Sequence, residues 1–196
     1  MKGEFSMQQG KIVTLSGISG IGKSHLKTYI LANEPNFQSL ISVTTRKPRE
    51  KERPGIDKFF YSLEDFEKEK NQGKLRTVNQ VFENWYAYKE SQIDLCDRGI
   101  NLITELFYKN VQEFKIDFPN TLSVYVLPDD IERTKKELKS RKLEASDLIK
   151  RLKDIDDELA FFYSNIELFD IVIINDYTER SCLLFQQLIE HKMRSD

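Results

Sequence analysis

Eight residues near the start of the chain have the types and spacing of a phosphate-binding loop. The segment Gly17-Ile18-Ser19-Gly20-Ile21-Gly22-Lys23-Ser24 fits the pattern G-x-x-x-x-G-K-[ST]. In such a loop, glycines let backbone N–H groups curl around the β- and γ-phosphates, and the N-terminus of the next helix adds partial positive charge. Lys23 is expected to neutralise phosphate charge, and the Ser24 hydroxyl is expected to bind Mg²⁺.

Two arginines downstream have the spacing for a second phosphate. Arg46 and Arg49 are three residues apart, with Pro48 between them, in a basic loop. A guanidinium donates paired hydrogen bonds to phosphate oxygens, so the pair suits a phosphate monoester. The alternative is that the two side chains are ordinary surface charges.

The elements that must position these residues follow from the apolar pattern. The short segment 11–16 is apolar and rich in β-branched residues, which predicts a buried strand before the loop. The apolar residues within 25–31 have helical spacing, which predicts a helix after the loop. Further strands are predicted at 100–106, 122–127 and 171–174, the last apolar throughout and therefore expected to be buried on both faces. Helices are predicted at 63–70, 90–98 and 111–118, and a final helix is predicted from residue 178. Ser62 is expected to cap the first of these, and Ser146 is expected to cap a further helix that begins after it.

Strands that alternate with helices predict a parallel α/β sheet covered on both faces. Residues 39–90 are richer in β-formers and aromatics and are expected to form a small inserted lobe, whereas residues 1–9 are expected to be a disordered lead. The chain has 196 residues, of which 39% are hydrophobic and 32% charged, enough for one core.

Composition also narrows the possible partners and the location. The net charge of −2 argues against a general nucleic-acid binder. Cys96 and Cys182 are too far apart in sequence for a metal motif or a disulfide framework, which suits a reduced cytoplasm. No stretch approaches the length of a membrane span, so we expect a cytoplasmic protein with neither a membrane nor a nucleic-acid partner.

The spacing of several motifs resembles guanylate kinases over nearly the whole chain. The motifs are G-I-S-G-I-G-K-S at 17–24, S-V-T-T-R-K-P-R at 42–49, the aromatic segment through Tyr86, Y-V-L-P at 125–128, R-K-L-E-A-S at 141–146 and I-I-N-D at 173–176. The resemblance implies one P-loop NTPase domain, a three-layer α/β/α fold with a parallel central sheet. Its core is residues 10–38, 91–133 and 161–196, its mostly-β insert for the nucleoside monophosphate is 39–90, and its helical lid is 134–160.

The resemblance also implies roles for individual residues. The implied catalytic residues are Lys23, Arg141 and Arg151. The implied ATP-binding residues are Gly17, Ser19, Gly20, Ile21, Gly22, Lys23, Ser24, His25 and Asn175, and the implied Mg²⁺ ligands are Ser24 and Glu105. The implied acceptor-binding residues are Ser42, Arg46, Arg49, Lys58, Thr77, Tyr86 and Tyr88. Alternatives stay open for some of them, because Arg141 and Arg151 lie among many other charges and Asn175 also suits a turn.

Four positions depart from the family pattern. Thr77 stands where the family has a glutamate that reads guanine, and Phe107 replaces an acid. Tyr88 replaces a Ser or Thr, and Lys58 replaces a tyrosine that usually joins the phosphate contacts. We therefore expect an ATP–Mg²⁺ phosphotransferase whose best single acceptor is GMP but whose discrimination for guanine is weakened. The alternatives are another nucleoside monophosphate or a phosphorylated ribose, as in ribose 1,5-bisphosphate phosphokinase, and a non-catalytic guanylate-kinase-like binding module. Degenerate modules of that kind commonly lose the phosphate loop, whereas this chain keeps it.

Overall fold

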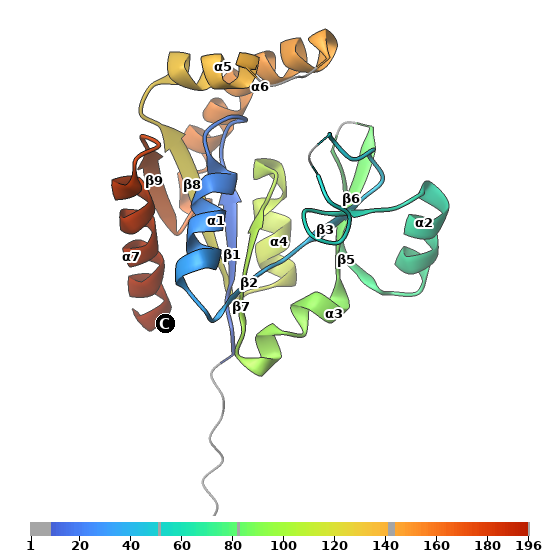
Figure 1. Ribbon diagram of the computed structural model, residues 1–196. Coiled ribbons are helices and arrows are strands. Elements are labelled where there is room, and N and C mark those ends of the chain that lie inside the picture. Colours follow the sequence, from blue (N-terminus) through green and yellow to red (C-terminus); the bar gives the residue numbers. More distant parts are fainter. Residues whose placement is uncertain (1–8, 51, 82, 141–143, 196) are drawn as a thin grey trace, which may run out of the picture. The chain divides into compact units, whose positions relative to one another are not determined.

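The computed structural model describes residues 9–50, 52–81, 83–140 and 144–195, which form two sheets (Figure 1). The larger sheet has the strand order β2 (Phe37–Ser39), β7 (Asn101–Glu105), β1 (Ile12–Ser16), β8 (Thr121–Pro128) and β9 (Ile171–Asn175). β2 pairs with β7, and β8 with β9, in parallel. Helices separate these strands along the chain, so the α/β fold predicted from the sequence is confirmed.

The described chain divides into two compact units. The first unit holds residues up to 12, 36–104 and 113–121, and the second holds residues 13–35, 105–112 and 122 onward. Each unit brings together its own set of charged and polar side chains.

The smaller sheet belongs to the first unit. Its strand order is β4 (Phe59–Phe60), β3 (Ser42–Thr44), β6 (Asn84–Lys89) and β5 (Leu75–Val81). Helix α2 (Leu63–Asn71) packs against β5, and the core between them contains Val43, Phe66, Leu75 and Ala87. Ser62 caps α2 as predicted, because its hydroxyl accepts the N–H of Asp65 at 3.0 Å.

The rest of the first unit is helical or extended. A short helix α3 (Glu90–Ile93) is followed by the 3₁₀ turn η1 (Cys96–Arg98), where the sequence predicted one continuous helix. Gly99 ends this segment at φ 79°. Most of α4 (Val111–Asp117) also lies in this unit.

The second unit contains the longer helices. They are α1 (Lys23–Asn33), α5 (Ile131–Ser140), α6 (Ala145–Ser164) and α7 (Glu179–Ser195), with the 3₁₀ turns η2 (Tyr108–Asn110) and η3 (Ile166–Leu168). α7 packs against β9 and beside α1 (Figure 1). Tyr125 of β8 stacks on Phe162 of α6 at a ring-centroid distance of 4.1 Å. It also meets Phe169 edge-on at a centroid distance of 4.9 Å.

The last strand is not buried on both faces, so that prediction is wrong. Ile171 and Ile173 are buried, whereas the side chains of Val172 and Ile174 are 39% and 59% exposed. β9 lies at the edge of the larger sheet, and strand order cannot be read from the composition of one strand.

The predicted helix cap at Ser146 is also wrong. α6 begins at Ala145, directly after Glu144, which places Ser146 inside the first turn. Serine is acceptable there, but its hydroxyl is past the position from which a cap accepts the first N–H groups.

Other predictions rested on composition. Cys96 and Cys182 are both buried and free. Among the described residues, no helix is both long and apolar enough to cross a membrane. The lead expected over residues 1–9 lies outside the described residues, apart from Gln9.

Candidate functional site

In the second unit, the predicted phosphate loop connects β1 to α1. The strand ends at Ser16 and the helix begins at Lys23. Gly17, Gly20 and Gly22 have φ values of 138°, 93° and 88°, which side chains disfavour. A Cβ at Gly17 would collide with the carbonyl oxygen of Val126, so this turn accepts only glycine there.

Lys23 and Arg151 both reach this loop. The Nζ of Lys23 donates to the carbonyl oxygens of Gly17 and Ile18, the latter at 3.0 Å. From α6, Arg151 donates through Nη1 to the Ser19 hydroxyl at 3.1 Å. The two cationic side chains therefore lie against a loop whose pattern predicts phosphate binding, while Arg141 lies outside the described residues.

The two predicted Mg²⁺ ligands also lie together. The Ser24 hydroxyl, in the first turn of α1, donates to Oε1 of Glu105 at 2.7 Å. A hydroxyl and a carboxylate are hard oxygen donors of the kind Mg²⁺ prefers, and Mg²⁺ usually completes its shell with phosphates and water. The donor set therefore fits the metal. His25 follows in α1 with an exposed side chain.

Asn175 supports the loop from the end of β9. Its side chain is fully buried, its Nδ2 donates to the Ile21 carbonyl at 2.7 Å, and its Oδ1 accepts the Tyr177 N–H at 3.1 Å. These two hydrogen bonds use both the amide nitrogen and the amide oxygen of Asn175. Through the first of them, the side chain contacts the phosphate loop.

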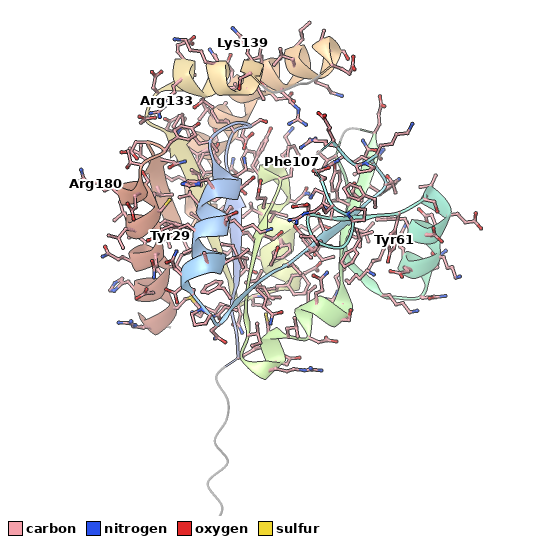
Figure 2. The ribbon with its side chains drawn as sticks, viewed as in Figure 1. Tyr29, Tyr61, Phe107, Arg133, Lys139 and Arg180 are labelled. Atoms are coloured by element: carbon pink, nitrogen blue, oxygen red, sulfur yellow. The ribbon has the colours of Figure 1, made fainter. Side chains whose placement is uncertain are left out.

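Tyr177 is a second support, which sequence reasoning missed. Its hydroxyl donates to the Gly20 carbonyl at 2.6 Å, and its backbone has a φ of 63°, unusual for a residue with a side chain. The Arg133 guanidinium lies 4.7 Å from the ring centroid, and Figure 2 shows Arg133 near the start of α5. The positive φ depends on distant contacts, so no local pattern could have identified it.

A cavity of 380 Å³ lies beside this tyrosine. It is lined by Arg133, Lys136, Ser140 and Tyr177. An aromatic ring with cationic and hydroxyl groups around it suits a flat, polar-edged ligand.

Glu158 is a buried acid next to the same loop. It lies in α6 and its carboxylate accepts the N–H of Gly17. Burial raises the pKa of Glu158 to about 7, although the charge of Lys23 and the Gly17 N–H act in the opposite direction. A glutamate in a charged helix gives no sequence signal for such a position.

In the first unit, the two arginines predicted to bind an acceptor phosphate share one carboxylate. Arg46 donates through Nη1 and Nη2 to the two oxygens of Glu52, at 2.7 and 2.5 Å. The Arg49 backbone N–H donates to Glu52 at 2.8 Å. Burial tends to raise the pKa of Glu52, but the bonds from Arg46 and Arg49 outweigh it and lower that pKa to about 2.

Three more predicted acceptor residues lie near this pair. Lys58 donates through Nζ to the Ser42 hydroxyl at 2.8 Å and lies 5.8 Å from the centroid of the Tyr86 ring. The Tyr86 hydroxyl is also within hydrogen-bond reach of Arg46. The first unit therefore gathers Ser42, Arg46, Arg49, Lys58 and Tyr86 in one cationic cluster.

Thr77 and Tyr88 have different surroundings. Thr77 is buried at φ 48° and its hydroxyl donates to Oδ2 of Asp117 at 3.0 Å. The Tyr88 hydroxyl is 3.3 Å from that of Thr104, and its ring packs edge-on against Phe114. The structure thus places the carboxylate of Asp117, which sequence reasoning missed, beside a position where the sequence lacks one.

Comparisons of sequence identify the family of this chain, and a solved structure shares its fold. The family model described as guanylate kinase matches residues 9–192. A guanylate kinase of Mycoplasmoides gallisepticum is 34% identical over 187 residues, covering 94% of each chain, and one of Rickettsia felis is 28% identical over 183 residues, covering 92% of this chain and 93% of its own. The crystal structure of guanylate kinase from Anaplasma phagocytophilum has a TM-score of 0.71 at 24% identity, covering 94% of this chain and 87% of that one.

Proposed function

Because this chain belongs to the guanylate kinase family, we propose that it transfers the γ-phosphoryl group of ATP to GMP, which yields ADP and GDP. The chain is a kinase, which sets aside the alternative of a non-catalytic binding module. The part that remains a proposal is the identity of the acceptor, together with the residues that bind each substrate.

One observation carries the proposal: Lys23, Ser19 and Arg151 meet on the glycine-rich loop of the second unit. Phosphoryl transfer needs little covalent help from the protein, so positive charge held at the transferring group does most of the catalysis. Lys23 is assigned to the phosphates of ATP, and Arg151 to the charge that develops on the transferring group.

Ser24 and Glu105 are assigned to Mg²⁺, because their oxygens lie 2.7 Å apart and match its ligand preference. When bound, the ion would neutralise phosphate charge. Until then, the hydroxyl of Ser24 is oriented by its bond to the carboxylate.

The adenine of ATP is assigned to the cavity beside Tyr177. The Arg133 guanidinium carbon lies 4.7 Å from the centroid of the Tyr177 ring. Both groups line the cavity, and both suit stacking on a flat base. Asn175 contributes indirectly, through its bond to Ile21.

The acceptor phosphate is assigned to the cationic cluster of the first unit. Guanidinium, ammonium and phenol donors from Arg49, Lys58 and Tyr86 suit the three oxygens of a monoester, with Arg46 alongside. The Asp117 carboxylate beside Thr77 supports guanine as the base, because guanine presents N–H donors that a carboxylate can accept.

We also propose the functional division predicted from the sequence: core 10–38, 91–133 and 161–196, acceptor insert 39–90 and lid 134–160. A cytoplasmic location is proposed with it, since guanylate kinase substrates are intracellular nucleotides and both cysteines are free.

The test is a transfer assay with ATP and Mg²⁺ against GMP, AMP, UMP, CMP, ribose 5-phosphate and ribose 1,5-bisphosphate. GMP is expected to give the highest kcat/KM. A higher value for any other acceptor would overturn the assignment of GMP, and equal activity on guanosine would overturn the role of the cationic cluster.

A further inference from the structure

Glu52 in the first unit occupies the paired Nη1 and Nη2 donors of Arg46, one of the two faces through which a guanidinium can bind a phosphate. The pair is bidentate, with Nη···Oε distances of 2.7 and 2.5 Å, and the side chains of Arg46 and Glu52 are only 12% and 18% exposed. The same carboxylate accepts the Arg49 N–H at 2.8 Å and lies 3.9 Å from the Arg49 guanidinium. Glu52 therefore bridges both arginines assigned to the acceptor.

The donors of Arg46 are mostly committed to these contacts. A guanidinium has five N–H donors. Glu52 accepts from two of them, and the Lys47 carbonyl accepts a third through Nη1 at 2.9 Å. The Tyr86 hydroxyl is also within hydrogen-bond reach of the guanidinium. A phosphate that is to bind the Nη1 and Nη2 donors of Arg46 as a pair must therefore take the place of the carboxylate.

We propose that the Glu52 carboxylate is an internal stand-in for the acceptor phosphate, which the phosphate must displace from Arg46 when the acceptor binds. The proposal rests on the assignment of Arg46 and Arg49 to the acceptor. Carboxylate and phosphate suit the same guanidinium fork, so one can exchange for the other without a change in the arginine.

Because of this exchange, a ligand must carry more negative charge than a carboxylate to displace Glu52. A shielded guanidinium is costly to leave unpaired, so Glu52 keeps Arg46 neutralised and ordered before the acceptor arrives. A phosphate monoester dianion offers the two arginines twice the charge of a carboxylate, whereas a phosphate monoanion or a carboxylate ligand offers no gain. Glu52 thereby makes the site selective for dianions.

The same reasoning predicts how acceptor affinity depends on pH. The groups that face Glu52 and Arg46 are Arg49 from the same loop, Tyr86 from β6 and Lys58 beside its ring. The pKa of Glu52 is lowered to about 2, so the competing carboxylate stays ionised throughout the working range. The second pKa of a phosphate monoester is about 6, so the acceptor loses its extra charge below that pH while its competitor does not.

The decisive variant is Glu52→Gln, with Glu50→Gln as the matched control two residues away. Glutamine keeps the size of the side chain but removes the charge that competes. We expect the KM for GMP and the dissociation constant of inorganic phosphate, measured by calorimetry at pH 7.5, to fall about threefold to tenfold in Glu52→Gln. The KM for ATP should not change, and Glu50→Gln should match the wild type.

The pH profile separates this role from a structural one. Between pH 7.5 and 5.5, the wild type should lose several-fold more affinity for inorganic phosphate than Glu52→Gln does. A thermal melt of each variant reports its folding, and Glu52→Asp, which keeps the charge but shortens the reach, should also bind phosphate more tightly than the wild type.

A rise in the dissociation constant of phosphate in Glu52→Gln would overturn the proposal, because it would mean that Glu52 holds the arginines in place for the phosphate. Unchanged affinity and an unchanged pH profile would overturn it as well, since no exchange would then take place. Inorganic phosphate has no base, so these outcomes are independent of whether the wild type prefers GMP in the acceptor panel.

Discussion

Lys23 is expected to matter for chemistry and little for folding. Its Nζ donates to two carbonyls of the loop and lies near the carboxylate of Glu158. We expect Lys23→Ala to lower kcat by at least about two decades, because a cation aimed at developing charge is worth several kcal/mol, with little change in the melting temperature. Lys139→Ala is the control, since Figure 2 shows Lys139 on the outer side of α5. Wild-type turnover in Lys23→Ala would make the loop structural only.

Tyr177 is expected to act through the phosphate loop it holds. Tyr177→Phe removes only the bond from its hydroxyl to the Gly20 carbonyl. A buried hydrogen bond contributes about 0.5–1.5 kcal/mol, so the KM for ATP should rise by roughly two- to tenfold. The KM for the acceptor should not move. Tyr163→Phe, on a tyrosine that is 68% exposed, is the control and should leave both values unchanged.

Asp117 is the residue on which guanine recognition is expected to depend. Its carboxylate already accepts the Thr77 hydroxyl at 3.0 Å. Asp117→Asn exchanges one acceptor oxygen for a donor, which should lower kcat/KM for GMP about tenfold or more and leave AMP almost unaffected. An equal loss for GMP and AMP in Asp117→Asn would indicate a structural role instead.

At the scale of elements, the small sheet of the first unit depends on one helix. Phe66 of α2 is fully buried beside Val43, Leu75 and Ala87, and its ring lies 6.3 Å from that of Trp85. Phe66→Ala should lower the free energy of unfolding by about 3–5 kcal/mol, as truncations of large core side chains do. Urea denaturation measures the change.

The same helix supplies the control for this prediction. The side chain of Leu63, at the start of α2, is 58% exposed. Leu63→Ala should therefore cost well under 1 kcal/mol. Similar losses in Leu63→Ala and Phe66→Ala would mean that α2 does not pack on the sheet as described.

Elements whose signals are local were predictable from the sequence. The strand, glycine turn and helix around Gly22 follow from adjacent residues, and so does the cap of α2 at Ser62. The exposure of Val172 and Ile174 was not predictable, because it depends on which strand lies at the edge of the sheet.

The candidate site divides in the same way. Motif spacing identified the glycine loop and the arginine pair, whose residues are close in sequence. The partners Glu158 and Tyr177 are more than a hundred residues from the loop they contact, and Asp117 is 40 residues from Thr77. Their roles come from tertiary contacts, which neither charge pattern nor spacing encodes.

At the scale of the whole molecule, the net charge does not reveal the local groups of cationic side chains. The chain has 30 Lys and Arg against 32 Asp and Glu, so its net charge is −2. Within that average, each unit holds a cationic group, with Lys23 and Arg151 in the second and the arginine pair in the first. Phosphate binding by these groups is therefore expected to depend on their local placement, which the net charge of the chain does not reveal.

Glu158 links the stability of the whole molecule to pH. Its pKa is raised from 4.5 to about 7, so between these values the folded chain holds a proton that the unfolded chain has released. The resulting stabilisation is complete below pH 4.5 and is lost as the pH rises through 7. The shift corresponds to on the order of 3 kcal/mol in the free energy of unfolding.

We therefore expect the free energy of unfolding to fall between pH 5 and pH 7.5 in the wild type, and to fall less in Glu158→Gln, whose buried amide carries no charge at any pH. Urea denaturation at several pH values measures both slopes. Glu167→Gln, on an exposed glutamate of η3, is the control and should keep the wild-type slope. Equal slopes in Glu158→Gln and the wild type would mean that Glu158 is already ionised beside Lys23, in which case its charge stabilises the cation of the phosphate loop at every working pH.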